Sequence, residues 1–166
     1  LLPAFRYGTS EFLKAIGASK VVIGVSGGID SAVNAALYRS ILPAENILLV
    51  NTPTRYNSEL TKGLAAELAK NLGCQLLTVP IGDFIDETAD ALEGLPLPDD
   101  TVHLTGFMKE NMQARDRSSR ILAALSAAFG GIFTCNANKT ETTVGYGTLY
   151  GDLAGAFAAT ADLWKY

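Results

Sequence analysis

The chain has 166 residues, of which 48% are hydrophobic and 18% are charged, and this composition excludes a disordered or fibrous protein. Its formal net charge of −4 argues against a duplex nucleic-acid binder that relies on diffuse positive potential. A small anion held locally remains compatible with that charge.

No apolar run approaches the ~20 residues that a membrane-spanning helix needs, and residues 1–6 lack the basic and apolar regions of a secretory signal. We therefore expect a cytoplasmic location and neither a membrane nor a nucleic-acid partner. At this length, residues 1–166 are expected to form a single domain. The chain begins without Met and stops at Tyr166 without turn or tail chemistry, so we expect it to be part of a longer chain, truncated at the C-terminus.

Short apolar runs alternate with longer periodic segments, which is the pattern of an α/β fold with a doubly wound parallel sheet. The predicted strands cover residues 20–25, 46–51, 74–79 and 131–135. They do not alternate between apolar and polar residues, and this pattern is typical of strands that are buried on both faces. The predicted helices cover residues 30–42, 58–72, 83–93 and 105–129, with one further short helix between 136 and 155.

Two details of these elements can be tested. In the first two helices, four-residue spacing predicts apolar stripes formed by Val33, Leu37 and Ile41 and by Leu60, Leu64, Leu68 and Leu72. The two cysteines, Cys74 and Cys135, are too few for a disulfide framework and lie in apolar strand-like runs. We expect both to be buried free thiols.

The first predicted strand runs directly into Ser26-Gly27-Gly28-Ile29-Asp30-Ser31, and a helix follows. Glycines let backbone N–H groups approach an anion closely, and a helix N-terminus adds unpaired donors and a positive dipole end. The string is not a Walker A loop, because Asp30 stands where that loop needs a lysine. We predict a phosphate-binding loop, although a tight turn capped by Asp30 and Ser31 would use the same residues.

Within this loop, Gly28 is expected to lie where backbone N–H groups meet phosphate. A valine there would fill that space and would resist a positive φ. Such a change is therefore expected to remove nucleotide binding while leaving a folded domain.

An acid beside a polyphosphate calls for a divalent cation, because Mg²⁺ is commonly held by one or two carboxylates together with phosphate oxygens. Asp30 supplies one carboxylate, and Glu141, after the last predicted strand, supplies another. Loops beyond the carboxyl ends of parallel strands gather at one edge of the sheet. We expect these two carboxylates to share a Mg²⁺, although Glu141 could also serve only as an acid at a helix start.

The Ser-Gly-Gly-Ile-Asp-Ser string resembles the PP-loop of the ATP pyrophosphatases, which cleave ATP between its α- and β-phosphates. Two further strings narrow the resemblance: Glu110-Asn111-Met112-Gln113-Ala114-Arg115-Asp116-Arg117 and Tyr150-Gly151-Asp152. Together they resemble NAD synthetase over almost the whole chain. Within this family, the amino-acid sequence is most similar to the synthetase part of glutamine-dependent enzymes.

This resemblance implies an adenine nucleotide alpha hydrolase-like fold and the ATP-dependent amidation of nicotinic acid adenine dinucleotide (deamido-NAD) to NAD. The carboxylate would be adenylated, and AMP and pyrophosphate would be released. ATP, deamido-NAD and ammonia would be the substrates, Mg²⁺ the cofactor, a homodimer the assembly, and a glutaminase domain a possible part of the longer chain. The alternatives are another PP-loop synthetase, such as the GMP-forming type, and a catalytically silent nucleotide-binding domain.

The resemblance also assigns roles to single residues. ATP and pyrophosphate would be bound by Ser26, Gly27, Gly28, Asp30, Ser31, Arg55 and Lys165. Deamido-NAD would be bound by Asn111, Arg115 and Asp152, and the metal by Asp30 and Glu141. Lys165 and Asp152 would be the catalytic residues, with Asp152 accepting protons from ammonia. Lys165 ends the string Asp162-Leu163-Trp164-Lys165, in which the family has Tyr where this chain has Trp164.

The spacing of three arginines makes a prediction that does not depend on the family. Arg115 and Arg117 lie two residues apart on one predicted helix, so they should point to different sides and serve different anions. Arg117 and Arg120 lie three residues apart and should share a face.

Overall fold

The computed structural model describes residues 1–54 and 59–165, so the predicted role of Arg55 lies outside the described residues. The helices and strands follow one another as α1 (Leu2–Ala15), β1 (Val21–Gly24), α2 (Ile29–Arg39), η1 (Ala44–Asn46), β2 (Ile47–Asn51), α3 (Glu59–Leu72), β3 (Gln75–Thr78), α4 (Asp83–Leu92), α5 (Gly106–Arg115), η2 (Asp116–Leu122), α6 (Ala123–Phe129), β4 (Ile132–Phe133) and α7 (Lys139–Val144). Each strand predicted from the sequence is present. Helix α1 was not predicted.

The four strands form one parallel sheet in the order β3-β2-β1-β4. Val21 of β1 pairs with Ile47 on one side and with Ile132 on the other, so β1 lies in the interior of the sheet. All strands point the same way, and their carboxyl ends meet at one edge. Because ligands bind beyond that edge in an open parallel sheet, the topology already places the functional site.

Alternate residues of the central strands enter two separate cores. Val21 and Ile23 pack in one core with Ala35 and Tyr38 of α2. Val22 packs in the other core with residues of η2 and with the partly buried Leu125 and Phe129 of α6. Helices therefore cover both faces of the sheet, and the predicted doubly wound α/β class is confirmed.

The edge strand β3 differs from the prediction that every strand is buried on both faces. Gln75 and Thr78 are exposed, and the two leucines between them are only partly buried. The physical reason is its position: β3 pairs only with β2 among the described strands, so one edge has no further strand. Cys74 and Cys135 are buried free thiols, as predicted.

The long helix predicted from residue 105 to residue 129 is present, but its middle third is a π-helix. Thr105 caps its start by accepting a hydrogen bond from the Met108 backbone N–H at 3.3 Å, and Gly130 ends it in the left-handed conformation. Between these ends, η2 separates α5 from α6. π-helical segments often occur at functional sites, and this one faces the edge where the strands end.

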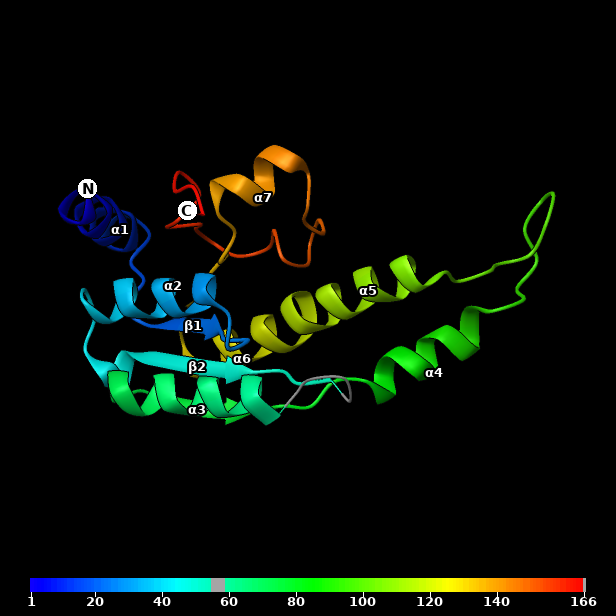
Figure 1. Ribbon diagram of the computed structural model, residues 1–166, viewed down its shortest axis with the longest axis horizontal. Coiled ribbons are helices and arrows are strands. Elements are labelled where there is room, and N and C mark those ends of the chain that lie inside the picture. Colours follow the sequence, from blue (N-terminus) through cyan, green and yellow to red (C-terminus); the bar gives the residue numbers. More distant parts are fainter. Residues whose placement is uncertain (55–58, 166) are drawn as a thin grey trace.

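Helices α4 and α5 extend from the sheet beyond the carboxyl ends of β1 and β2 and are joined by a loop at the far tip (Figure 1). Arg120 of η2 lies 4.8 Å from the ring centre of Phe84 in α4 and so fixes the base of this projection. None of the described helices is long and apolar enough to cross a membrane.

Candidate active site

The predicted phosphate loop follows β1 and leads into α2. The backbone conformations of its two glycines differ from the prediction. Gly27 has a φ of 83°, whereas Gly28 is the N-cap of α2 with a φ of −83°. A Cβ added to Gly28 would meet only Ser26 Oγ, at 3.2 Å. The expectation of a positive φ at Gly28 is therefore wrong, and the residue that needs conformational freedom is Gly27.

Two serine hydroxyls hold the loop closed on itself. The Gly28 backbone N–H donates to Ser26 Oγ at 3.3 Å, and the Ser26 backbone N–H donates to Ser31 Oγ at 3.3 Å. The Ser31 hydroxyl in turn donates to the Gly28 carbonyl at 3.0 Å. The loop N–H groups thus bond to neutral oxygens, which phosphate oxygens could replace with stronger, charge-assisted bonds.

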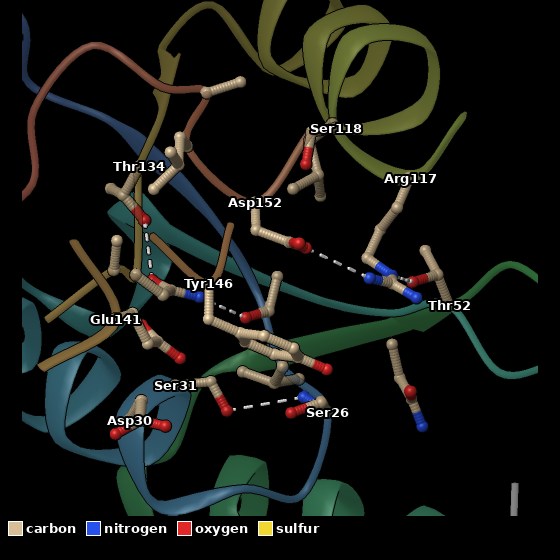
Figure 2. A pocket seen from close by; sticks show the side chains of 18 residues that line it. Ser26, Asp30, Ser31, Thr52, Arg117, Ser118, Thr134, Glu141, Tyr146 and Asp152 are labelled. Carbon is tan, nitrogen blue, oxygen red and sulfur yellow. Dashed lines mark hydrogen bonds and ion pairs between the residues drawn. The ribbon is translucent and has the colours of Figure 1, made fainter. Parts of the chain in front are cut away.

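A pocket of about 240 Å³ opens at this loop, and its walls come from the ends of β1, β2 and β4, from η2 and from residues 141–154. Figure 2 shows Ser26, Ser31 and Asp30 along one wall, with Asp152 and Arg117 across from them and the Tyr146 ring between. The pocket brings together segments that are more than 100 residues apart in the chain, because parallel strands end at the same edge.

Asp30 and Glu141, the predicted metal ligands, both line the pocket and both bond to Asn138. The Asn138 side-chain N–H donates to Asp30 Oδ1 at 3.2 Å, and the Asn138 backbone N–H donates to Glu141 Oε2 at 3.1 Å. Among the described residues, no three His, Cys, Asp or Glu side chains are grouped as metal ligands. A cation here would have at most two carboxylates from the protein, which suits Mg²⁺ bound to phosphate oxygens.

Lys165 pairs with Asp30 of the phosphate loop and does not line this pocket. Its Nζ donates to Asp30 Oδ2 at 2.7 Å, and this hydrogen bond and the carboxylate charge raise the pKa of Lys165. Its backbone N–H donates to Thr140 Oγ1 at 3.0 Å, so the segment is also attached to α7 independently of the side chain. The ammonium thus occupies the position of a counter-cation to Asp30.

Arg117 enters the pocket from η2 and was not among the predicted site residues. Its Nε donates to Thr52 Oγ1 at 3.1 Å, and its Nη1 lies 3.5 Å from Asp152 Oδ1. The backbone of Asp152 is held by the segment that follows β4, since the buried Cys135 thiol donates to the Asp152 carbonyl at 3.3 Å. Among the described residues that line the pocket, this guanidinium is the cation that faces the phosphate loop (Figure 2).

The prediction that Arg117 and Arg120 share a helix face is wrong. Arg120 pairs with the buried Asp116 and covers Phe84, while Arg117 points into the pocket. The reason is η2, because a π-helix closes i→i+5 hydrogen bonds and residues three apart no longer lie one above the other. Arg115 and Arg117 do point to different sides, as predicted.

Asn111 and Arg115 lie outside this pocket and contact the loop that carries the Tyr-Gly-Asp string. The Thr148 hydroxyl donates to Asn111 Oδ1 at 2.7 Å, and Arg115 Nε donates to the Leu149 carbonyl at 3.2 Å. A Cβ at Gly151 would come within 2.9 Å of Ala114, so this close approach requires glycine. The two strings therefore form one unit next to the pocket.

Three further pocket residues, Thr52, Asn136 and Tyr146, were not among the predicted site residues. Asn136 donates to the Gly24 carbonyl at 2.7 Å and so closes the end of β1 against the end of β4. Thr52 and Asn136 each follow a predicted strand within two residues, and this position could have singled them out. Tyr146 lies after α7 in an irregular segment, where no pattern marks it.

Comparison with known proteins agrees with this geometry. The family model described as NAD synthase matches residues 6–166. The glutamine-dependent NAD(+) synthetase of Synechocystis sp. is 40% identical over 165 residues, which are 99% of this chain and 29% of that protein.

Two solved structures have the same architecture. The glutamine-dependent NAD+ synthetase from Acinetobacter baumannii, in complex with ADP, has a TM-score of 0.87 at 33% identity, over 97% of this chain and 30% of that one. The NH3-dependent NAD synthetase from Campylobacter jejuni has a TM-score of 0.87 at 30% identity, over 99% of this chain and 67% of that one. The chain thus spans less than a third of the length of the glutamine-dependent relatives cited above. With a family model that covers nearly its whole length and a site built from the matching strings, the chain belongs to the NAD synthase family.

Proposed function

We propose that this chain provides the synthetase chemistry that converts deamido-NAD to NAD. The carboxylate of the nicotinic acid group attacks the α-phosphate of ATP, pyrophosphate leaves, and ammonia then displaces AMP to form the amide. The observation that carries the proposal is the pocket in which the Ser26–Ser31 loop faces Arg117 and Asp152. The membership in the NAD synthase family supports it.

The loop and Arg117 would bind the triphosphate from opposite sides. Backbone N–H groups and serine hydroxyls supply neutral donors on one side, and the guanidinium supplies a positive charge on the other. Both stabilise charge that moves onto pyrophosphate as the bond to the α-phosphate breaks. Catalysis then consists mainly of positioning and charge neutralisation, and no side chain has to act as a nucleophile.

Mg²⁺ fits the two carboxylates of Asp30 and Glu141, because both line the triphosphate pocket and are carboxylate donors, which this hard cation prefers. When bound, Mg²⁺ would neutralise phosphate charge. Two residues of this chain would hold it: Asp30 from the first turn of α2 and Glu141 from the first turn of α7.

Outside this pocket, Asn111 and Arg115 would bind deamido-NAD beside the Tyr-Gly-Asp loop. Asp152 lies where that loop enters the pocket, so its carboxylate is available to accept a proton from ammonia as the amide forms. A homodimer remains part of the proposal. So does a glutaminase domain that delivers ammonia, and the glutamine-dependent relatives support this domain.

The test is AMP release with each substrate left out in turn. The proposal expects AMP and NAD only when ATP, Mg²⁺, deamido-NAD and ammonium are all present. AMP release that does not depend on deamido-NAD would favour another PP-loop synthetase, and nucleotide binding without turnover would favour a silent nucleotide-binding domain.

The Lys165 ammonium and a bound Mg²⁺ would compete for the carboxylate of Asp30. We expect saturating Mg²⁺ to release Lys165 from Asp30 and thereby to speed its acylation by an amine-specific reagent, since the pKa raised by Asp30 falls back when the pair opens. Added ATP should slow the reaction again, because phosphate then takes the ammonium. Mass spectrometry of the labelled peptides measures both changes.

Lys139 is the internal control for this experiment. It lies on α7 near Lys165, but its Nζ is 5.2 Å from the centre of the Trp164 ring and does not pair with Asp30. Its labelling rate should not change with Mg²⁺. Equal labelling of Lys165 with and without Mg²⁺ would show that the two cations do not compete for Asp30.

A further inference from the structure

Asn138 connects the two carboxylates to which the proposed function assigns the metal ion. Its side chain is almost completely buried, with the residue 4% exposed, at the junction of α2 and α7. It donates from its side chain to Asp30 at 3.2 Å and from its backbone to Glu141 at 3.1 Å. One residue therefore holds one oxygen atom of each carboxylate.

Two of the contacts of Asn138 belong to helix capping. Its Oδ1 accepts from the Glu141 backbone N–H at 3.1 Å, and Glu141 bonds back to the Asn138 backbone, which together make the capping box of α7. Ser, Thr or Asp would cap this helix as well. The hydrogen bond to Asp30 is not part of the cap and therefore needs a separate explanation.

The amide side chain is the one capping group that has an acceptor and an N–H donor on two different atoms. Its oxygen caps α7, and its nitrogen reaches Asp30 on α2 at the same time. A single hydroxyl oxygen cannot occupy both places, and a carboxylate would repel Asp30. Capping α7 alone does not require Asn at position 138, whereas the additional hydrogen bond to Asp30 does.

We propose that Asn138 is the positioning residue of the metal site, which fixes the spacing and orientation of the Asp30 and Glu141 carboxylates. This inference rests on the proposed function, because that function assigns the metal to these carboxylates. Hydrogen-bond partners that orient metal ligands typically change metal affinity by roughly 10–100-fold when they are removed. We expect an effect of about 10-fold here, at the lower end of that range.

Asn138→Ser separates the two tasks of this residue, because serine keeps the cap and loses the hydrogen bond to Asp30. Thr142→Ala is the matched control on the same helix: it removes a hydroxyl that donates to the Asn138 carbonyl at 3.2 Å and leaves both carboxylate contacts in place. Mn²⁺ replaces Mg²⁺ as the probe, and its binding to the nucleotide-free chain is measured by electron paramagnetic resonance. Unfolding temperatures are measured in EDTA.

Asn138→Ser should bind Mn²⁺ about 10-fold more weakly than the unchanged chain, with an unfolding temperature within about 2 °C of it. Thr142→Ala should bind Mn²⁺ normally. Equal Mn²⁺ affinity for Asn138→Ser and the unchanged chain, together with weaker binding by Asp30→Asn, would limit Asn138 to capping and overturn the inference. Unchanged Mn²⁺ binding by Asp30→Asn would instead remove the metal site from these carboxylates, and the metal assignment of the proposed function would fail with it.

Discussion

Replacing Gly28 by valine should abolish the binding of Mg-ATP and pyrophosphate while leaving the unfolding temperature of the free chain almost unchanged. Gly28 has an extended backbone conformation, with φ −83° and ψ 158°, which valine adopts readily. An added Cβ would meet only Ser26 Oγ, at 3.2 Å. The two methyl groups would then cover the donors that phosphate needs, so the fold survives and the anion site does not.

Gly27→Val is the matched comparison, because Gly27 has a φ of 83°. A β-branched residue is strained there, and we expect a loss of about 1–3 kcal/mol in unfolding free energy. Thermal unfolding with and without Mg-ATP distinguishes the two variants. A ligand at 100 times its Kd stabilises the folded chain by about 2.7 kcal/mol. Gly28→Val should lose this stabilisation, whereas Gly27→Val should lower the stability of the free chain. If Gly28→Val keeps the full Mg-ATP shift of the unchanged chain, the loop does not bind phosphate.

Changing Arg115 or Arg117 to methionine should weaken the binding of a different ligand in each case. Arg117 lines the pocket and faces the phosphate loop, so Arg117→Met should weaken the binding of Mg-ATP. Arg115 lies outside the pocket, where it donates to the Leu149 carbonyl, and the proposed function assigns it to deamido-NAD. Arg115→Met should therefore weaken the binding of deamido-NAD. Loss of a hydrogen bond to a charged group costs roughly 1.5–3 kcal/mol, or about 10- to 150-fold in affinity.

Each arginine variant is the control for the other, because both carry the same substitution on one continuous helix. Isothermal titration calorimetry with the two ligands gives four affinities. The predicted result is a crossed pattern in which each variant loses one ligand and keeps the other within about twofold. If both variants lose both ligands equally, the helix is merely distorted and the two assignments are wrong.

The sheet was predictable because its strands are short apolar runs followed by glycine or polar residues. The stripes on the covering helices were less predictable. Val33 and Leu64 are exposed, whereas the buried positions on these helices include Ala35, Ala65 and Ala69. Small residues let a helix lie close to the sheet, and their weak hydrophobicity hides them from a periodicity argument.

The site was predictable in its parts but not in its assembly. The glycine loop and the position of Glu141 after a strand could be read from spacing. The direction of Arg117 could not, because it depends on a π-helix that interrupts a regular helical sequence. The contact of Lys165 with Asp30 joins residues 135 apart in the chain, and only the folded structure brings them together.

The proposed function requires the deamido-NAD carboxylate to be adenylated at the pocket between the Ser26–Ser31 loop and Arg117. Deamido-NAD labelled with oxygen-18 in its carboxylate tests this most directly, with unlabelled ATP, Mg²⁺ and ammonium and with mass spectrometry of the products. Attack of the carboxylate on the α-phosphate predicts that AMP carries one oxygen-18 atom for each NAD formed, and that pyrophosphate carries none. AMP without the label, or ADP in place of AMP, would contradict adenylation of this carboxylate.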